Sequence, residues 1–341
     1  MSMIESYLKE RTSQQGRSTY QPGDSLEQWS RQLRLRIKER LGGFPDIASA
    51  LNPVRLEHTV CDGYIRERVE ITTYEGLRMP VYMLFPAERD ASSENSIRPA
   101  VIACHGHGYG SREVTGMEPD GAPRAGDPGL HKDFAVSLVK RGYIVAVPEL
   151  LGFGDRRLEE DRDAAPGVSS CTKIAAHLLM VGETLAGHRV YEMMRVFDYL
   201  SERADVDSER IGMMGISGGG LVTAFTAALD ERCRAAVVSG YASTFQGSIL
   251  DRNHCLDNYI PGILLESELP DIIGLMVPRP LFIEAGSDDR VFPLSSAKEA
   301  YARLTEIYEQ QGAAELLDAD FFAGGHEISG AIAYDWLERF L

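Results

Sequence analysis

The chain has 341 residues, and its 51 acidic against 35 basic side chains give a formal net charge of −16. Nucleic acids and anionic membrane surfaces need a partner of the opposite sign, so neither is expected to bind this protein. The charged fraction of 25% and the hydrophobic fraction of 44% are typical of a globular protein, and no apolar run reaches the ~18 residues of a membrane span. These numbers exclude the disordered and membrane-spanning classes.

The cysteines and the first residues bear on the cell compartment. The five cysteines are scattered and lack CxxC spacing, which predicts reduced thiols rather than a disulfide framework: Cys61, Cys104, Cys171, Cys233 and Cys255. Charged residues stand in the first segment where a signal peptide would have its apolar centre. We therefore expect a cytoplasmic protein.

The N-terminal region divides into two parts. Residues 1–24 are polar and without periodicity, which predicts a loose arm. Over residues 25–42 the apolar side chains recur on one helical face, and five Arg and Lys side chains occupy the other face, which we expect to be solvated rather than docked. Residues 1–53 then form an arm and an amphipathic helix, an extension compatible with a homo-oligomer. The catalytic domain is expected at 54–341.

The rest of the chain predicts an α/β fold. Residues 54–86 alternate polar and apolar side chains, which indicates antiparallel strands. After a polar loop, short apolar runs alternate with amphipathic helices, one of them expected to begin with a capping box at Ser296 and Glu299. This pattern predicts a mostly parallel sheet with antiparallel N-terminal strands and helices on both faces. Two connections, near 151–183 and 241–276, are longer than a crossover needs and indicate functional insertions.

A serine in a sharp turn is the candidate nucleophile. The strand pattern RIGMM runs directly into GISGG at 215–219, and a helix pattern follows. This is G-x-S-x-G between a strand and a helix, and it predicts Ser217 as a nucleophile on a strained turn. Gly215 and Gly219 would relieve crowding there, and the helix N-terminus would stabilise an anion. The alternative is a Gly/Ser-rich turn that only allows close helix–strand packing.

A serine hydroxyl needs a base and a group that orients the base. Asp289 lies in the turn after the strand pattern PLFIEAG, and His326 lies in a Gly-flanked loop after ELLDADFF. The order Ser, Asp, His is that of the α/β-hydrolases. Asp289 is preferred to Asp288 because it lies further out on the turn. Taken alone, each residue could be a turn cap or a surface histidine, but their joint placement predicts a triad with Ser217.

The loop after the strand pattern PAVIAC has the sequence HGHG at 105–108. In this fold it contributes an oxyanion donor, so we assign the oxyanion to the backbone N–H groups of Gly218 and His107. A metal site at His-x-His is disfavoured because no third ligand follows nearby, and no metal or cofactor is expected. Glu149 could contact substrate or form a salt bridge that fixes the next insertion. The candidate pocket residues are His105, Tyr109, Glu149, His254 and Cys255.

At these motifs the chain resembles the α/β-hydrolase superfamily and, within it, dienelactone-hydrolase-like and acetyl xylan esterase-like serine esterases. The resemblance runs from about residue 55 to the C-terminus and rests on four motifs: HGHG at 105–108, GISGGG at 215–220, PRPLFIEAGSDD at 278–289 and GGH at 324–326. True dienelactone hydrolases have a cysteine where this chain has Ser217. The Arg-Gly-Gln-Gly signature of certain carbohydrate deacetylases is also not matched.

The resemblance implies a serine carboxylic-ester hydrolase that works through an acyl-enzyme. Its expected partner is a small-molecule ester with a short acyl group, acetyl first, and acetylated sugars are included. Two alternatives stay open. One is a serine peptidase of the prolyl-oligopeptidase type, which usually carries a large additional domain. The other is a hydrolase-fold protein that binds without catalysing.

Overall fold

The structure is a computed structural model that describes residues 2–13, 16–87 and 97–341. Its helices and strands, in chain order, are α1 (Met3–Thr12), α2 (Leu26–Arg40), β1 (Val54–Cys61), β2 (Tyr64–Tyr74), β3 (Leu77–Pro86), β4 (Arg98–Cys104), α3 (Ser111–Val114), α4 (Phe134–Lys140), β5 (Ile144–Pro148), α5 (Cys171–Leu179), α6 (Leu185–Ser201), β6 (Val206–Ile216), α7 (Gly218–Leu229), β7 (Cys233–Ser239), α8 (Leu269–Ile273), β8 (Leu281–Gly286), α9 (Leu294–Gln310), β9 (Leu317–Phe322) and α10 (Ala333–Glu338).

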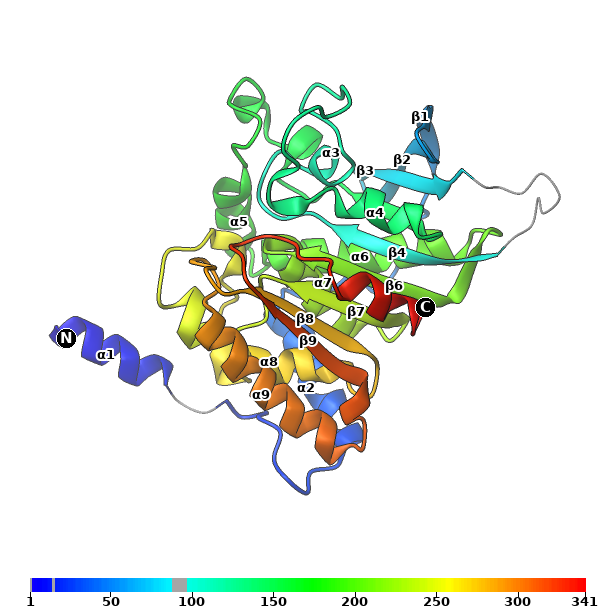
Figure 1. Ribbon diagram of the computed structural model, residues 1–341. Coiled ribbons are helices and arrows are strands. Elements are labelled where there is room, and N and C mark those ends of the chain that lie inside the picture. Colours follow the sequence, from blue (N-terminus) through cyan, green and yellow to red (C-terminus); the bar gives the residue numbers. More distant parts are fainter. Residues whose placement is uncertain (1, 14–15, 88–96) are drawn as a thin grey trace.

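One nine-stranded sheet runs through the protein in the order β1-β2-β3-β5-β4-β6-β7-β8-β9 (Figure 1). Strands β1, β2, β3 and β5 pair antiparallel in succession, and every pair from β5–β4 to β8–β9 is parallel. The predicted fold class is therefore confirmed. Because parallel strands end at the same edge of the sheet, the loops after β4, β5, β6, β8 and β9 can meet there.

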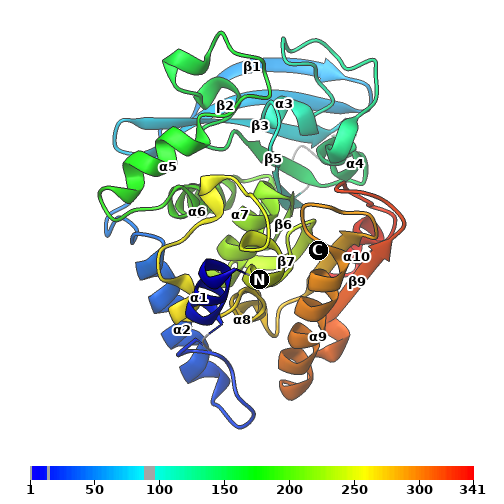
Figure 2. The same ribbon diagram turned by 90° about the vertical axis from the view of Figure 1, so that its left-hand side faces the viewer.

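The strand sequences place apolar side chains on both faces of the sheet. Val81 and Met83 of β3 belong to the core under α2, α6, α7, α8 and α9. Their neighbours Tyr82 and Leu84 belong to a second core under α4 and α10. Successive side chains of a strand point to opposite faces, so continuous apolar runs are the sequence of a sheet covered on both sides (Figure 2).

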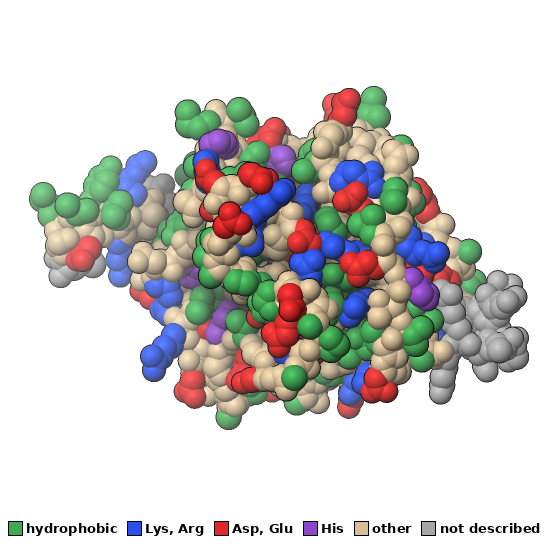
Figure 3. All heavy atoms as spheres, turned by 90° about the horizontal axis from the view of Figure 1, so that it is seen from above, with side chains coloured by type: hydrophobic (Ala, Val, Ile, Leu, Met, Phe, Trp, Pro, Cys, Tyr) green, Lys and Arg blue, Asp and Glu red, His purple; other side chains and the backbone are tan. Residues whose placement is uncertain are grey.

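The first residues differ from the expected loose arm, because Met3–Thr12 form α1. The helix has a capping box between Ser2 and Glu5, and none of its residues is buried. Local capping rather than an apolar core face therefore forms it, which is why periodicity did not predict it. Its exposed apolar side chains include Met3, Ile4 and Tyr7, and Figure 3 shows hydrophobic atoms on this projecting helix. Whether it mediates a homo-oligomer remains a prediction.

Helix α2 confirms the amphipathic helix but corrects the solvated basic face. Trp29, Leu33 and Ile37 are buried in the main core, as the pattern predicts. Arg34 donates to the carbonyl oxygens of Ala228 and Leu275, at 2.9 and 3.0 Å. The five basic positions thus do not form one solvated face, because some guanidinium groups reach carbonyls on neighbouring elements.

The buried carboxylate of Glu266 holds the other end of α2. It accepts hydrogen bonds from Arg36 at 3.1 Å and from Arg40 at 3.0 Å, and Arg17 of the preceding segment adds another at 2.8 Å. The Glu266 side chain is only 2% exposed. The N-terminal extension is therefore fastened to the body of the protein by ion pairs as well as by apolar packing.

The capping box expected at Ser296 and Glu299 is wrong. Helix α9 begins at Leu294 after Pro293, without a side-chain cap. The Ser296 hydroxyl instead accepts a hydrogen bond from the backbone N–H of Thr244, at 3.0 Å. The N-cap position is Pro293, three residues before Ser296, so Ser296 lies inside the first turn, where its hydroxyl bonds to another segment.

The two long connections are ordered segments in the structure. The first, 151–183, contains two short 3-10 turns and α5, and the second, 241–276, contains a π-helical turn at Phe245–Ile249 and α8. Helix α5 of the first packs against the 3-10 turn Leu256–Asn258 of the second. Among the described residues, no helix combines the length and apolar character needed to cross a membrane.

Candidate active site

Ser217 occupies the turn between β6 and α7. Its backbone has φ 57° and ψ −122°, a positive φ that is unusual for a residue other than glycine. The turn leaves no room for side chains on either side. A Cβ at Gly215 would collide with the carbonyl oxygen of Gly219, and a Cβ at Gly219 would collide with that of Cys104. The two glycines therefore allow the strained turn, and such strain is typical of functional sites.

Asp289 and His326 come together at the neighbouring strand ends. The Nδ1 atom of His326 lies 2.7 Å from Oδ2 of Asp289. The other oxygen, Oδ1, accepts the backbone N–H groups of Val291 and Phe292, at 2.7 and 2.9 Å. These donors hold the carboxylate in place, and the Phe292 ring stacks on the imidazole with centroids 5.8 Å apart. Asp288, the alternative acid, is exposed.

The His326 ring lies beside the end of β7. A Cβ built at Gly240 would lie 3.1 Å from both Nδ1 and Cε1 of the ring. The preceding residue, Ser239, accepts the backbone N–H of Ser217 at 3.0 Å. The imidazole and the serine are thus both next to the last residues of β7. Within the described residues, the side chains of Ser217 and His326 form no hydrogen bond with each other.

The HGHG loop lies directly against Ser217. A Cβ at Gly106 would lie 2.9 Å from the carbonyl oxygen of Ile216 and 3.1 Å from the Ser217 Cβ. The His107 ring covers Gly218, whose Cβ would lie 3.2 Å from its Nδ1. Neither the N–H of His107 nor that of Gly218 donates a hydrogen bond in the described part of the chain. The loop that carries His107 and the first residue of α7 therefore both lie beside the serine.

A family model supplies the wider context. The model Abhydrolase_7, described as an abhydrolase family, matches residues 3–315. The chain belongs to this abhydrolase family. A similar protein, "Putative hydrolase YtaP" of Bacillus subtilis (strain 168), is 29% identical to this abhydrolase over 269 residues, which cover 77% of this chain and 83% of the relative.

Solved structures share the fold of this abhydrolase. One, described as a "putative acetyl xylan esterase" from Bacteroides fragilis NCTC 9343, has a TM-score of 0.82 at 18% identity and covers 100% of this chain and 96% of that chain. Another, a glucuronoyl esterase from Solibacter usitatus, has a TM-score of 0.66 at 16% identity and covers 96% of this chain and 94% of that chain. At these identities the likeness shows the fold, and the predicted α/β-hydrolase resemblance is confirmed.

Two buried histidines of the abhydrolase hold the HGHG loop by hydrogen bonds to its backbone. His105 is fully buried, with Nδ1 2.8 Å from the carbonyl oxygen of Gly106 and Nε2 accepting the N–H of Leu150 at 3.1 Å. The same Nε2 also lies 3.4 Å from Oε1 of Glu149, just after the end of β5. His131, also fully buried, accepts the N–H of Gly106 at 2.9 Å. Sequence analysis missed His131, because it comes from an irregular loop 25 residues beyond Gly106.

Glu149 and Tyr109 both form hydrogen bonds to the segment that follows β4. The buried Glu149 carboxylate accepts the backbone N–H and the hydroxyl of Ser111, at 2.9 and 2.7 Å. The Tyr109 hydroxyl donates to the carbonyl oxygen of Met117 at 2.8 Å and accepts from Arg124 at 2.6 Å. Both side chains therefore fix the segment that follows β4. Glu149 also pairs with the buried His105, whose Nε2 lies 3.4 Å from its Oε1, and a second buried salt bridge fixes the next insertion.

That salt bridge joins Arg156 to Glu192 on α6. Its two hydrogen bonds measure 2.7 and 2.6 Å, and the side chains are 4% and 0% exposed. Arg156 also donates to the backbone carbonyl of Glu149, at 3.0 Å. The pair fixes the beginning of the first insertion to the body of the protein.

His254 and Cys255 lie on the second insertion, at the side of the site facing His107. The Nε2 atom of His254 is 3.1 Å from the Ser248 hydroxyl, and its ring centroid is 5.1 Å from that of Phe292, which stacks on His326. Cys255 lies close to Cys171 and Asp257, which sequence analysis did not single out. The second insertion therefore approaches both the His326 side and the His107 side of Ser217.

Glu284, inside β8, is a second residue that sequence analysis missed. It is fully buried, and its carboxylate oxygens accept the Ser239 hydroxyl at 2.5 Å and the backbone N–H of Gly330 at 2.7 Å. Burial raises the pKa of Glu284 to about 7. This residue ties the end of β7 to the loop that carries His326, beneath the candidate site. The sequence signal that could have identified Glu284 is an acidic residue inside an otherwise apolar strand.

Proposed function

We propose that this abhydrolase is a serine carboxylic-ester hydrolase with Ser217 as nucleophile, His326 as base and Asp289 as the residue that orients the base. The observation that carries the proposal is the 2.7 Å contact between His326 and Asp289 at the strand ends beside the Ser217 turn. An aspartate held by two backbone donors, with its second oxygen on a histidine, is suited to fix that ring in one tautomer.

In the proposed reaction, the Ser217 Oγ attacks the ester carbonyl carbon while its proton passes to Nε2 of His326. Asp289 stabilises the imidazolium through Nδ1–H. The developing oxyanion accepts hydrogen bonds from the backbone N–H groups of Gly218 and His107. The partial positive charge at the N-terminus of α7 stabilises it further. The alcohol leaves with the proton from His326. Water, deprotonated by the same ring, then releases the acid and restores Ser217.

The substrate class proposed is an ester with a short acyl group, acetyl first, on a small alcohol or sugar. Two observations support it. The solved structures with this fold include proteins described as an acetyl xylan esterase and a glucuronoyl esterase. The second insertion also brings His254 close to Phe292 and Cys255 close to His107, and we expect these side chains to limit the room for a long acyl chain.

A panel of substrates tests the proposal. We expect kcat/KM to be highest for p-nitrophenyl acetate, lower for the butyrate and lowest for the octanoate, with acetylated xylose also hydrolysed. Faster cleavage of an aminoacyl p-nitroanilide than of any ester would favour the peptidase alternative instead. A folded chain that turns over none of these esters would contradict the proposal and favour the non-catalytic alternative.

A further inference from the structure

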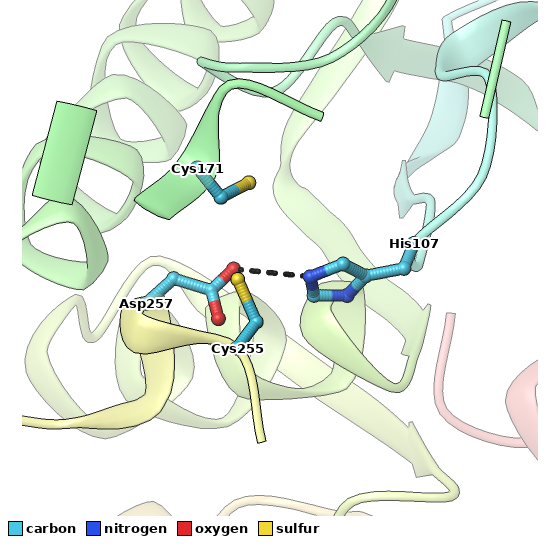
Figure 4. Close-up of side chains that lie close together, drawn as sticks. All are labelled: His107, Cys171, Cys255 and Asp257. Carbon is cyan, nitrogen blue, oxygen red and sulfur yellow. Dashed lines mark ion pairs between the residues drawn. The ribbon is translucent and has the colours of Figure 1, made fainter. Parts of the chain in front are cut away.

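Four side chains gather beside the candidate site, on the His107 side of Ser217 (Figure 4). They are His107 from the HGHG loop, Cys171 at the first turn of α5, and Cys255 and Asp257 from the second insertion. One ligand-type atom of each lies within 4.8 Å of the others. Figure 4 shows the side chains approaching one another from the HGHG loop, from α5 and from the second insertion.

We propose that His107, Cys171, Cys255 and Asp257 form a binding site for a thiophilic divalent cation, and that the ion it fits best is zinc. Two thiolates, one imidazole and one carboxylate are donors that Zn²⁺ takes in tetrahedral sites. Hard cations such as Mg²⁺ and Ca²⁺ prefer oxygen donors throughout. The donor set therefore selects among metals.

The four candidate ligand atoms lie slightly further apart than they would around a bound zinc ion. With Zn–S of about 2.3 Å and Zn–N or Zn–O of about 2.0–2.2 Å, tetrahedral ligands lie roughly 3.3–3.8 Å apart. The observed limit of 4.8 Å requires a contraction of about 1 Å, which rotations of the partly exposed His107 and Cys255 side chains can supply. Cys171 and Asp257 are buried and already fixed.

An unsatisfied atom points to a missing partner in this cluster. The Nε2 atom of His107 is buried without a hydrogen bond, and the nearest carboxylate oxygen, Oδ2 of Asp257, is 3.6 Å away. Buried polar atoms are nearly always satisfied, so an orphaned imidazole nitrogen facing two thiols and a carboxylate needs explanation. A bound cation would satisfy it.

Arg189 supplies the surroundings that such an ion needs. This buried guanidinium donates to Oδ2 of Asp257 at 2.6 Å and to Sγ of Cys171 at 2.9 Å. The remaining oxygen of Asp257 accepts from Asn258 at 2.7 Å. Donors of this kind orient metal ligands. Two thiolates and one carboxylate carry three negative charges, which a divalent cation and Arg189 neutralise together.

The proposed ion would have a structural role and is given no step in ester hydrolysis. Four protein ligands close the coordination sphere, as in structural zinc sites. They join α5 and the second insertion to the HGHG loop, which packs against Ser217 at Gly106. A bound ion would therefore fasten both insertions to the HGHG loop. The inference concerns binding alone and does not rest on the proposed function.

Cobalt titration of the reduced, full-length protein tests the proposal. After treatment with a chelator and a thiol-free reductant, one equivalent of Co²⁺ should produce thiolate-to-cobalt absorption in the near ultraviolet and the visible bands of a tetrahedral site. One equivalent of Zn²⁺ should remove both signals. Zinc should also raise the thermal unfolding midpoint of the protein, because it binds the folded state.

Matched cysteine variants locate the site. Cys255→Ser should lower zinc affinity by at least the roughly 10- to 100-fold that loss of even an outer partner costs. Cys61→Ser, which removes a cysteine from the distant strand β1, should bind as the wild type does. Circular dichroism verifies that each variant is folded, and Cys171→Ser replaces Cys255→Ser if the latter is not.

Two results would overturn the proposal. One is a reduced, folded wild-type chain that shows no thiolate-to-cobalt absorption at micromolar metal. The other is a folded Cys255→Ser or Cys171→Ser variant that keeps wild-type zinc affinity. Either would leave the cluster as a hydrogen-bonded group around Arg189.

Discussion

Two groups of polar side chains flank Ser217, and they are held in different ways. On one side, both oxygens of Asp289 are satisfied by His326 and two backbone N–H groups, in loops that directly follow β8 and β9. On the other side, His107 keeps a buried nitrogen without a hydrogen bond, and its neighbours come from two insertions fixed by Arg189. The polar atoms of the first group are paired within the protein, whereas the second group leaves a buried nitrogen that the proposed cation would satisfy.

This difference indicates that the two groups have different roles, one in the proposed chemistry and the other in stability. Strand ends place the residues of the proposed chemistry, because the parallel sheet fixes where each loop begins. The insertions add a second layer, whose stability depends on a buried ion pair. Changes on the Asp289 side should therefore alter turnover with little effect on folding, and changes on the Arg189 side should first alter folding.

The largest effect is expected for Ser217→Ala. Without the nucleophile, kcat for p-nitrophenyl acetate should fall about 10⁶-fold, as for other serine hydrolases. The unfolding midpoint should stay near that of the wild type, since alanine bears the positive φ no worse than serine does. Ser201→Ala, an exposed serine at the end of α6, is the control and should retain full activity. Steady-state kinetics showing unreduced turnover in Ser217→Ala would refute the assignment.

The next largest loss of turnover is expected at Asp289, and the adjacent Asp288 serves as its control. Asp289→Asn should lower kcat about 10⁴-fold, because the amide can no longer hold the His326 tautomer. Asp288→Asn should remain within a few-fold of wild type, since that side chain is exposed and bonds nothing in the triad. Parallel kinetic assays of the two variants decide the matter. Equal losses, or a greater loss in Asp288→Asn, would show that the acid is wrongly assigned.

On the Arg189 side, Asp257→Ala should mainly reduce stability. It leaves a guanidinium that is 1% exposed without its carboxylate, and a broken buried pair costs about 3–5 kcal/mol. Asp251→Ala, which removes an exposed partner of Arg252, should cost at most about 1 kcal/mol. Urea denaturation measures both. If the two variants lose the same free energy of unfolding, the buried pair has no special role.

The smallest effect is a pH dependence from Glu284. Its pKa is about 7 in the folded protein against 4.5 ordinarily, so between these values the folded state keeps a proton that the unfolded state has lost. Stability therefore falls as pH rises through this window, by on the order of 1–3 kcal/mol. Glu284→Gln, which cannot ionise, should lack this fall. Unfolding free energies at pH 5 and pH 8 test it, and identical pH profiles for the two proteins would contradict it.

How much the sequence predicts depends on what fixes each residue. The fold, the Ser217 turn and the strand-end positions of Asp289 and His326 follow from strand patterns and glycine spacing. Asp257 and Arg189 do not, because they lie 68 residues apart, and Asp257 comes from an irregular part of the second insertion that packs against α6. The docking of Arg34 was missed for a similar reason, since two of its partners are backbone carbonyls, which cannot be recognised from residue types.

The sharpest measurement is covalent labelling with a fluorophosphonate, followed by peptide mass spectrometry. The account predicts one adduct per chain, on Ser217, with loss of esterase activity in step with labelling and a much slower reaction in Asp289→Asn. An inhibited enzyme whose adduct lies on any other residue, or an active enzyme that the probe leaves unmodified at Ser217, would contradict it.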